Sequence, residues 1–228
     1  MLKKTKGLVI NYLKYKESSI IVKIFTRELG LKSYIVNSVR SAKSKSKMGF
    51  YQPLTLLDLV VYDKEKSSLN RISEVKLHYA FQRIPFDFYR SGVAMFVGEV
   101  LGKSIYENYT NESLYDFLEE AITYLDQEET NIQLYPISFL LETSKFLGFG
   151  TSDSTELFEQ LFGLVHDDDF AREEKKYLNE LMENSFSSSL HVPAVYRRKI
   201  MDDLIKFYQL HLDGFSELKS VKVLRNLY

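Results

Sequence analysis

Residues 6–39, KGLVINYLKYKESSIIVKIFTRELGLKSYIVNSV, decide the fold. Three short segments rich in Val, Ile, Tyr and Phe alternate there with the turn-prone segments KYKE and RELG. The segments are KGLVINYL (6–13), SSIIVKIFT (18–26) and LKSYIVNSV (31–39). Runs of β-branched and aromatic residues bounded by polar turns predict strands. The chain therefore begins with three strands in close succession.

Two further segments extend this pattern. LTLLDLVVYD (54–63) and LNRISEVKL (69–77) are also strand-like, and the polar segment DKEKSS joins them as a hairpin connection. Five short strands within about 75 residues are too few for a sandwich and predict a small closed barrel of the OB-fold type. Residues 40–53 join the third strand to the fourth and end at Pro53, which cannot continue a central strand.

From about residue 78 onward the apolar residues recur with a helical period. Asn111 is expected to cap the start of one helix and Ser216 the start of the last, while Gly148 is expected to end a third. The predicted helices cover residues 86–106, 111–126, 134–148, 153–162, 172–186, 193–214 and 216–228. The predicted fold class is α+β, with an OB-fold barrel in residues 1–80 and an all-helical domain in residues 81–228.

The net charge of −1 conceals two oppositely charged parts. Residues 1–80 contain 16 Lys and Arg against 6 Asp and Glu, whereas residues 81–228 contain 14 against 25. Such an asymmetry indicates that the basic part binds a polyanion, usually nucleic acid or an anionic membrane. The alternative is that the two parts simply attract each other.

The sharpest basic signal is RSAKSKSKMG, residues 40–49, which has four cations and no acid. We expect a mobile loop whose cations contact phosphates, with an ordinary solvated loop as the alternative. Other cations of the first 40 residues are interleaved with tyrosines that either stack on bases or belong to the barrel core. The predicted DNA-binding residues are Arg40, Lys43, Lys45, Lys47, Lys14, Lys16, Arg27, Lys32, Tyr12 and Tyr34.

A second group of cations lies in the acidic part of the chain, in YRRK (196–199) and in the last predicted helix. Cations near the end of a helix are stabilised by its dipole and need no ligand. Alternatively, they border a groove that receives an acidic, apolar peptide. The predicted peptide-binding residues are Arg197, Arg198, Lys199, Lys219 and Lys222.

Enzyme and metal signatures are missing from the sequence. The chain has no cysteine, which excludes disulfides, thiolate nucleophiles and cysteine zinc sites, and its four histidines are scattered. HDDD at 166–169 is typical of a solvated turn, and no phosphate-binding GxxxxGK or nucleophilic GxSxG motif occurs. No apolar run of about 18 residues and no signal peptide is found, so we expect a cytoplasmic protein without a membrane segment, cofactor or metal.

Several motifs in a fixed order resemble the RecO family of bacterial DNA repair and recombination proteins. FTRELG (25–30) precedes the basic segment, and YQPLTLLDLVVY (51–62) resembles the family's entry to the fourth strand. FYQLHL (207–212) and LKSVKVL (218–224) resemble the family's end. The resemblance covers nearly the whole chain.

The resemblance implies a non-enzymatic recombination mediator in the bacterial cytoplasm, associated with the nucleoid. It implies binding of single- and double-stranded DNA, strand annealing, and cooperation with RecR so that RecA replaces single-stranded-DNA-binding protein. It also implies binding of the acidic C-terminal tail of that protein, and places Arg40, Lys43, Lys45 and Lys47 in the family's DNA-contacting loop. The alternative is an interaction adaptor with incidental DNA affinity. Many members carry a four-cysteine zinc module after the helix end at LGFG (147–150), which this chain lacks.

Overall fold

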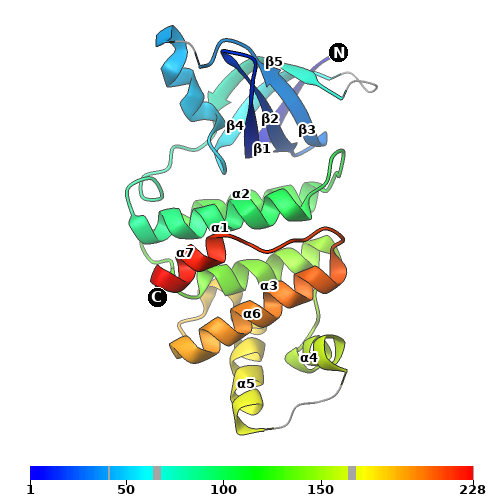
Figure 1. Cartoon of the computed structure of the whole chain (residues 1–228), viewed down its shortest axis with the longest axis vertical. Helices are drawn as coiled ribbons and strands as arrows, with labels where there is room; N and C mark the ends of the chain where they lie inside the picture. Colours follow the sequence, from blue (N-terminus) through cyan, green and yellow to red (C-terminus); the bar gives the residue numbers. More distant parts are fainter. Residues whose placement is uncertain (41, 64–67, 164–167, 228) are drawn as a thin grey trace. The chain divides into compact units, whose positions relative to one another are not determined.

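The computed structural model of the chain describes residues 1–40, 42–63, 68–163 and 168–227, with the side chains of residues 42–46, 226 and 227 left out (Figure 1). Its contacts divide the chain into two compact units. The barrel unit contains Met1–Pro85 and Gly98–Tyr124, and the helical unit contains Phe86–Val97 and Leu125–Tyr228. Among the described residues, no helix combines the length and the apolar composition needed to cross a membrane.

Five strands form the closed barrel that the sequence predicts. They are β1 (Leu2–Tyr15), β2 (Ser19–Thr26), β3 (Gly30–Val36), β4 (Leu56–Tyr62) and β5 (Asn70–Leu77), arranged in the order β1-β2-β3-β5-β4. β1 closes the barrel because its first half pairs with β4 and its second half with β2. The register shifts between Val9 and Asn11, where this long strand changes its course between partners.

The barrel core consists of the inward-facing side chains of these strands. Strand side chains alternate between two faces, so one face of each strand supplies the interior. The buried cluster is Val9, Ile20, Val22, Ile24, Tyr34, Val39, Tyr51, Leu57, Leu59 and Val61.

The connection between β3 and β4 differs from the prediction. Instead of a loop, residues Ala42–Tyr51 form a 3₁₀ helix, η1. Val39 before the helix and Tyr51 at its end are 2% and 3% exposed in the barrel core, with Met48 and Phe50 packed against it. These apolar anchors hold a helix that is long for its class. Lys43 and Lys45 lie on it, but their side chains are outside the described residues.

The barrel unit also contains α2 (Glu112–Leu125) and the second part of α1 (Phe88–Ser104). The predicted cap at Asn111 is confirmed, because its Oδ1 accepts a hydrogen bond from the Leu114 amide at 2.9 Å. The segment before α2 is bonded to β3, since the Leu31 amide donates to the Tyr109 carbonyl at 3.0 Å. Tyr115 of α2 then packs on Phe25 of β2.

The helical unit is built around α3 (Tyr135–Leu147) and α6 (Ala194–His211), where the Tyr208 hydroxyl donates to the Leu140 carbonyl at 2.8 Å. The predicted C-cap at Gly148 is confirmed by its left-handed backbone. The remaining elements are α4 (Ser154–Phe162), α5 (Asp169–Asn184), the 3₁₀ turn η2 (Ser185–Ser187) and α7 (Ser220–Leu227).

The predicted start of the last helix at Ser216 is wrong, because α7 begins at Ser220. The preceding residues stay non-helical and bury Phe215 and Leu218, which are 5% and 2% exposed. The Phe215 ring lies 5.2 Å from that of Tyr208. Packing on α6 therefore outweighs the local capping preference of Ser216.

Gly30 provides a test of the barrel unit. Its φ is +71°, and a Cβ atom there would lie 2.2 Å from the Tyr109 carbonyl oxygen. Gly30→Ala should therefore lower the free energy of unfolding by about 2 kcal/mol or more. Gly49→Ala is the matched control, because a Cβ there meets nothing within 4 Å. Chemical denaturation measures the free energy of unfolding of both variants. An equal effect of the two substitutions would contradict the requirement for glycine at position 30.

Candidate nucleic-acid interface

Several cations of the basic barrel are paired within their own unit by acids of α2. The Arg27 guanidinium binds Asp116 through Nε at 2.6 Å and Nη2 at 2.8 Å, and Glu112 through Nη1 at 2.9 Å. The hydrogen bond between Arg27 and Asp116 raises the pKa of the guanidinium and lowers that of the carboxyl. Lys6 and His78 both contact Glu119 at 2.8 Å.

A second group of cations surrounds Asp63, whose side chain is 3% exposed at the end of β4. Lys3 donates to this carboxylate at 2.7 Å and Lys32 at 2.5 Å. These two hydrogen bonds hold the pKa of Asp63 below its usual value, against the opposing effect of burial. The triad ties β1 and β3 to the end of β4.

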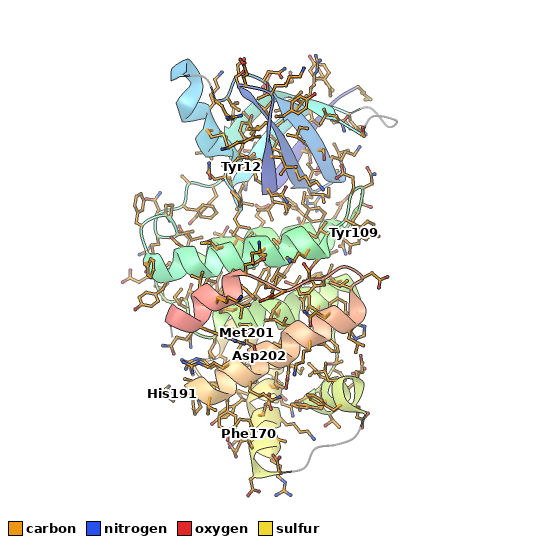
Figure 2. All side chains as sticks on the ribbon, viewed as in Figure 1. Tyr12, Tyr109, Phe170, His191, Met201 and Asp202 are labelled. Atoms are coloured by element: carbon orange, nitrogen blue, oxygen red, sulfur yellow. The ribbon has the colours of Figure 1, made fainter. Side chains whose placement is uncertain are left out.

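These contacts and the burial of the barrel core bear on three of the predicted DNA-binding residues, of which Tyr34 alone is placed where its predicted role is ruled out. Arg27 and Lys32 already have carboxylate partners, and the Lys32 side chain is only 15% exposed. The Tyr34 ring is fully buried in the barrel core, so its predicted role in base stacking is wrong. The alternation of β3 directs this ring inward. Tyr12 is half-buried and packs against the same core (Figure 2).

Four other predicted cations remain exposed: Lys14, Lys16, Arg40 and Lys47. Within the described parts of the chain, none of the four forms an ion pair, and we call them the cationic set. The Arg40 amide donates to the Ser18 carbonyl at 3.0 Å, and its guanidinium donates to the Lys16 carbonyl at 3.2 Å. These bonds bring Arg40 to the turn between β1 and β2, which contains Lys16. Lys47 lies on η1, which follows Arg40 along the chain.

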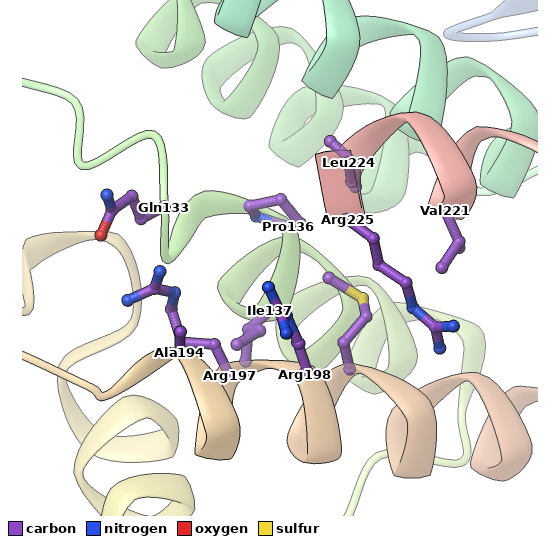
Figure 3. Close-up of a pocket in the computed structure, with 10 residues that line it drawn as sticks. Gln133, Pro136, Ile137, Ala194, Arg197, Arg198, Val221, Leu224 and Arg225 are labelled. Carbon is purple, nitrogen blue, oxygen red and sulfur yellow. The ribbon is translucent and has the colours of Figure 1, made fainter. Parts of the chain in front are cut away.

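The helical unit contains a groove between the start of α3, the first half of α6, and α7 (Figure 3). α6 contributes Arg197 and Arg198, and α7 contributes Arg225. The Arg197 guanidinium is fixed by donation to the Val192 carbonyl at 2.6 Å, and Arg225 is bonded to Asp202. The groove is otherwise mainly apolar, with Pro136, Ile137, Ala194, Met201, Val221 and Leu224 among its lining residues.

Three predicted peptide-binding residues do not line this groove. Lys199 instead binds Asp203 and lies 3.7 Å from Glu174 of α5, because helix positions two apart lie on nearly opposite sides. Lys222 is 3.2 Å from Glu217, and Lys219 is exposed outside the lining. Prediction from the sequence missed the apolar lining, whose residues come from three separate segments.

Two residues of the HDDD stretch are described, and both belong to the start of α5. Asp168 caps α5 by accepting a hydrogen bond from the Ala171 amide at 2.7 Å, and Asp169 begins that helix. The other two residues of HDDD lie outside the described ranges. No cluster of three or more His, Asp and Glu side chains suited to a metal ion occurs among the residues described.

Glu174 makes the stability of the helical unit sensitive to pH. Its side chain is 2% exposed, and burial raises its pKa from 4.5 to about 7, with the nearby Asp203 acting in the same direction and Lys199 opposing it. Between pH 4.5 and 7 the unfolded chain releases this proton while the folded chain retains it, so the free energy of unfolding falls as pH rises.

Glu174→Gln should therefore be more stable than the wild type at pH 8, by on the order of 2 kcal/mol, and should show no such gain at pH 4.5. Denaturant unfolding at the two pH values measures this difference. Glu173→Gln, one residue earlier on α5 and half-exposed, is the control and should change little at either pH. Equal gains in stability at both pH values would show that the pKa of Glu174 is not the cause.

Comparisons with known proteins cover the whole chain. Family models described as "Recombination protein O N terminal" and "Recombination protein O C terminal" match residues 1–81 and 85–154. DNA repair protein RecO of Flavobacterium psychrophilum is 38% identical over 237 residues, covering 99% of this chain and 98% of that protein. The proteins of the same name from Flavobacterium johnsoniae and Phocaeicola vulgatus are 38% and 34% identical, with 99% and 100% of this chain covered, and 98% and 100% of theirs.

Proposed function

This chain belongs to the RecO family of DNA repair proteins, and from that premise we propose that it is a non-enzymatic, DNA-binding recombination mediator. It binds and anneals DNA strands and, with RecR, helps RecA replace single-stranded-DNA-binding protein. The observation that carries this proposal is the cationic set: four exposed cations for which the described structure provides no acidic partner.

The barrel binds DNA through phosphates. Lysine and arginine side chains on an exposed surface gain affinity by releasing counterions from the backbone, independently of base sequence. The paired cations behave differently, because Arg27, Lys6 and Lys32 already have carboxylate partners that phosphates would have to displace. The basic composition of the barrel therefore has two uses, one in holding the unit together and one in binding DNA.

The groove of the helical unit binds the acidic C-terminal tail of single-stranded-DNA-binding protein. Its apolar lining accommodates apolar side chains, and its arginines attract carboxylates. Arg197 is held in place by its bond to the Val192 carbonyl, so its guanidinium requires little further ordering when a peptide binds. DNA and the tail thus occupy different units of the chain.

The triple substitution Lys14→Ala, Lys16→Ala and Lys47→Ala should weaken DNA binding at every sequence tested. For single strands, each phosphate contact contributes about −0.7 to the slope of log K against log salt. Losing three contacts should therefore make the slope less negative by about 2. Fluorescence anisotropy titrations at several salt concentrations measure it. Lys176→Ala, Lys206→Ala and Lys222→Ala, which remove the same charge from exposed positions of the helical unit, form the control. An equal loss of DNA affinity in both variants would contradict the assignment of DNA binding to the cationic set.

The groove is tested by annealing of complementary strands coated with single-stranded-DNA-binding protein. Arg197→Ala with Arg198→Ala should slow this reaction at least tenfold while leaving annealing of bare strands unchanged, because only the coated strands require the tail. Removing the acidic tail of single-stranded-DNA-binding protein should slow annealing by the wild type as much as the double substitution does. It should cause no further slowing of the variant. Lys222→Ala, outside the groove, should behave as the wild type. Tight DNA binding without any annealing would instead indicate an interaction adaptor.

A further inference from the structure

Four large apolar side chains are exposed around the start of α1. Phe86 is 84% exposed, Phe88 74%, Tyr89 50% and Met95 60%. All four belong to the segment Phe86–Val97 of the helical unit, and we call them the α1 patch. Phe88 and Met95 are separated by two helical turns and therefore share one face of the helix. Soluble monomers seldom expose several neighbouring residues of this size unless they form an interaction site.

The rest of the same helix is buried in this part: Val93 and Val97 lie opposite Phe88 and Met95, and Phe96 lies between the two sides. Val93, Phe96 and Val97 are 0% exposed. α1 is thus apolar on both sides in this part, which is typical of a helix that is covered all round. The buried side packs within the chain, and the α1 patch is the side that is exposed among the described residues.

The α1 patch is held in a fixed conformation. Asp87 accepts a hydrogen bond from the Arg90 amide at 3.0 Å and so caps the first turn of α1. The Arg90 side chain is buried and donates to the Leu125 carbonyl at 3.0 Å and the Glu128 carbonyl at 3.3 Å. A partner that binds here meets an ordered surface, which lowers the entropic cost of association.

The surroundings of the patch are acidic. The Asp87 side chain is 41% exposed, and the bond from Arg90 brings the exposed residues Glu128 and Glu129 to the first turn of α1. The positive charge of Arg90 itself is buried among these groups. This rim repels DNA and acidic peptides and attracts a basic surface. The arginine-bordered groove has the opposite preference, so the two surfaces of the helical unit select different partners.

We infer that the α1 patch is a docking surface for a partner protein that presents apolar side chains bordered by lysine and arginine. The identity of that partner rests on the proposed function, in which the chain itself binds two proteins, RecR and the tail of single-stranded-DNA-binding protein. The acidic tail is repelled by the rim, which leaves RecR. Aromatic and methionine side chains such as those of the patch are enriched in protein interfaces and often carry most of their binding energy.

The test is the affinity of the full-length chain for purified RecR, measured by titration. Phe88→Ser with Met95→Ser should weaken binding at least tenfold, because both side chains would be buried by the partner. Val195→Ser with Leu210→Ser, at positions 56% and 57% exposed on α6, is the matched control and should change the affinity less than twofold. Circular dichroism confirms that both variants fold, and Phe86→Ser, at the most exposed position of the patch, is a second, milder variant.

A charge variant tests the rim separately. Asp87→Asn with Glu129→Gln keeps the helix cap and removes two negative charges, so it should slow association with RecR and flatten its salt dependence. Unchanged affinity of the Phe88/Met95 variant would overturn the inference while leaving the proposed function intact. Failure of the wild type to bind RecR would overturn both. Sedimentation of the chain alone completes the test, because self-association lost in the Phe88/Met95 variant would assign the patch to a second copy instead.

Discussion

Closure of the barrel by β1 is the constraint on which the rest of the barrel unit depends. This strand of 14 residues pairs with β4 along its first half and with β2 along its second. The same pairing fixes where the cations of β1 lie. Lys3 meets Asp63 at the end of β4, Lys6 meets Glu119 of α2, and Lys14 continues past the core toward the β1–β2 turn. One strand thus supplies both Lys3 and Lys6, which bind acids within the unit, and Lys14, which stays exposed.

As a consequence, the net charge of residues 1–80 is larger than the positive charge that the barrel exposes to a partner. The first 80 residues carry a large excess of cations, but α2 and Asp63 neutralise a substantial part of it. Acids of α2 reach the barrel because the segment before that helix is bonded to β3 at Leu31. The exposed remainder includes Lys14, Lys16, Arg40 and Lys47 near the β1–β2 turn and in η1, and Lys4, Arg71 and Lys76 on β1 and β5.

The helical unit separates its interactions by charge in a similar way. Arginines of α6 and α7 border an apolar groove, whereas acids surround the apolar residues at the start of α1. A peptide attracted to one surface is repelled by the other. In the same unit, the buried carboxyl groups of Glu174 and Asp203 and the partly exposed Lys199 join α5 to α6. A buried polar cluster of this kind fixes how two helices meet, but it leaves that contact sensitive to pH.

The strands, most of the helices and the family could be predicted from the sequence. Alternation of apolar residues predicted all five strands, Asn111 and Gly148 predicted helix ends, and the order of the motifs predicted the RecO family. These signals are local, because strand alternation and capping depend on neighbouring residues.

Only the tertiary structure shows which charged and aromatic side chains are exposed and which are paired or buried. Arg27 and Asp116 are 89 residues apart, and no local pattern reveals that they meet. Closure of the barrel makes the face of β3 that bears Tyr34 the inner one, and burial of Val39 and Tyr51 orders η1. Burial of Phe215 outweighs the capping preference of Ser216, so α7 begins four residues later. Each of these outcomes depends on burial and ion pairing between distant segments, whose free energy exceeds the local preferences that a sequence displays.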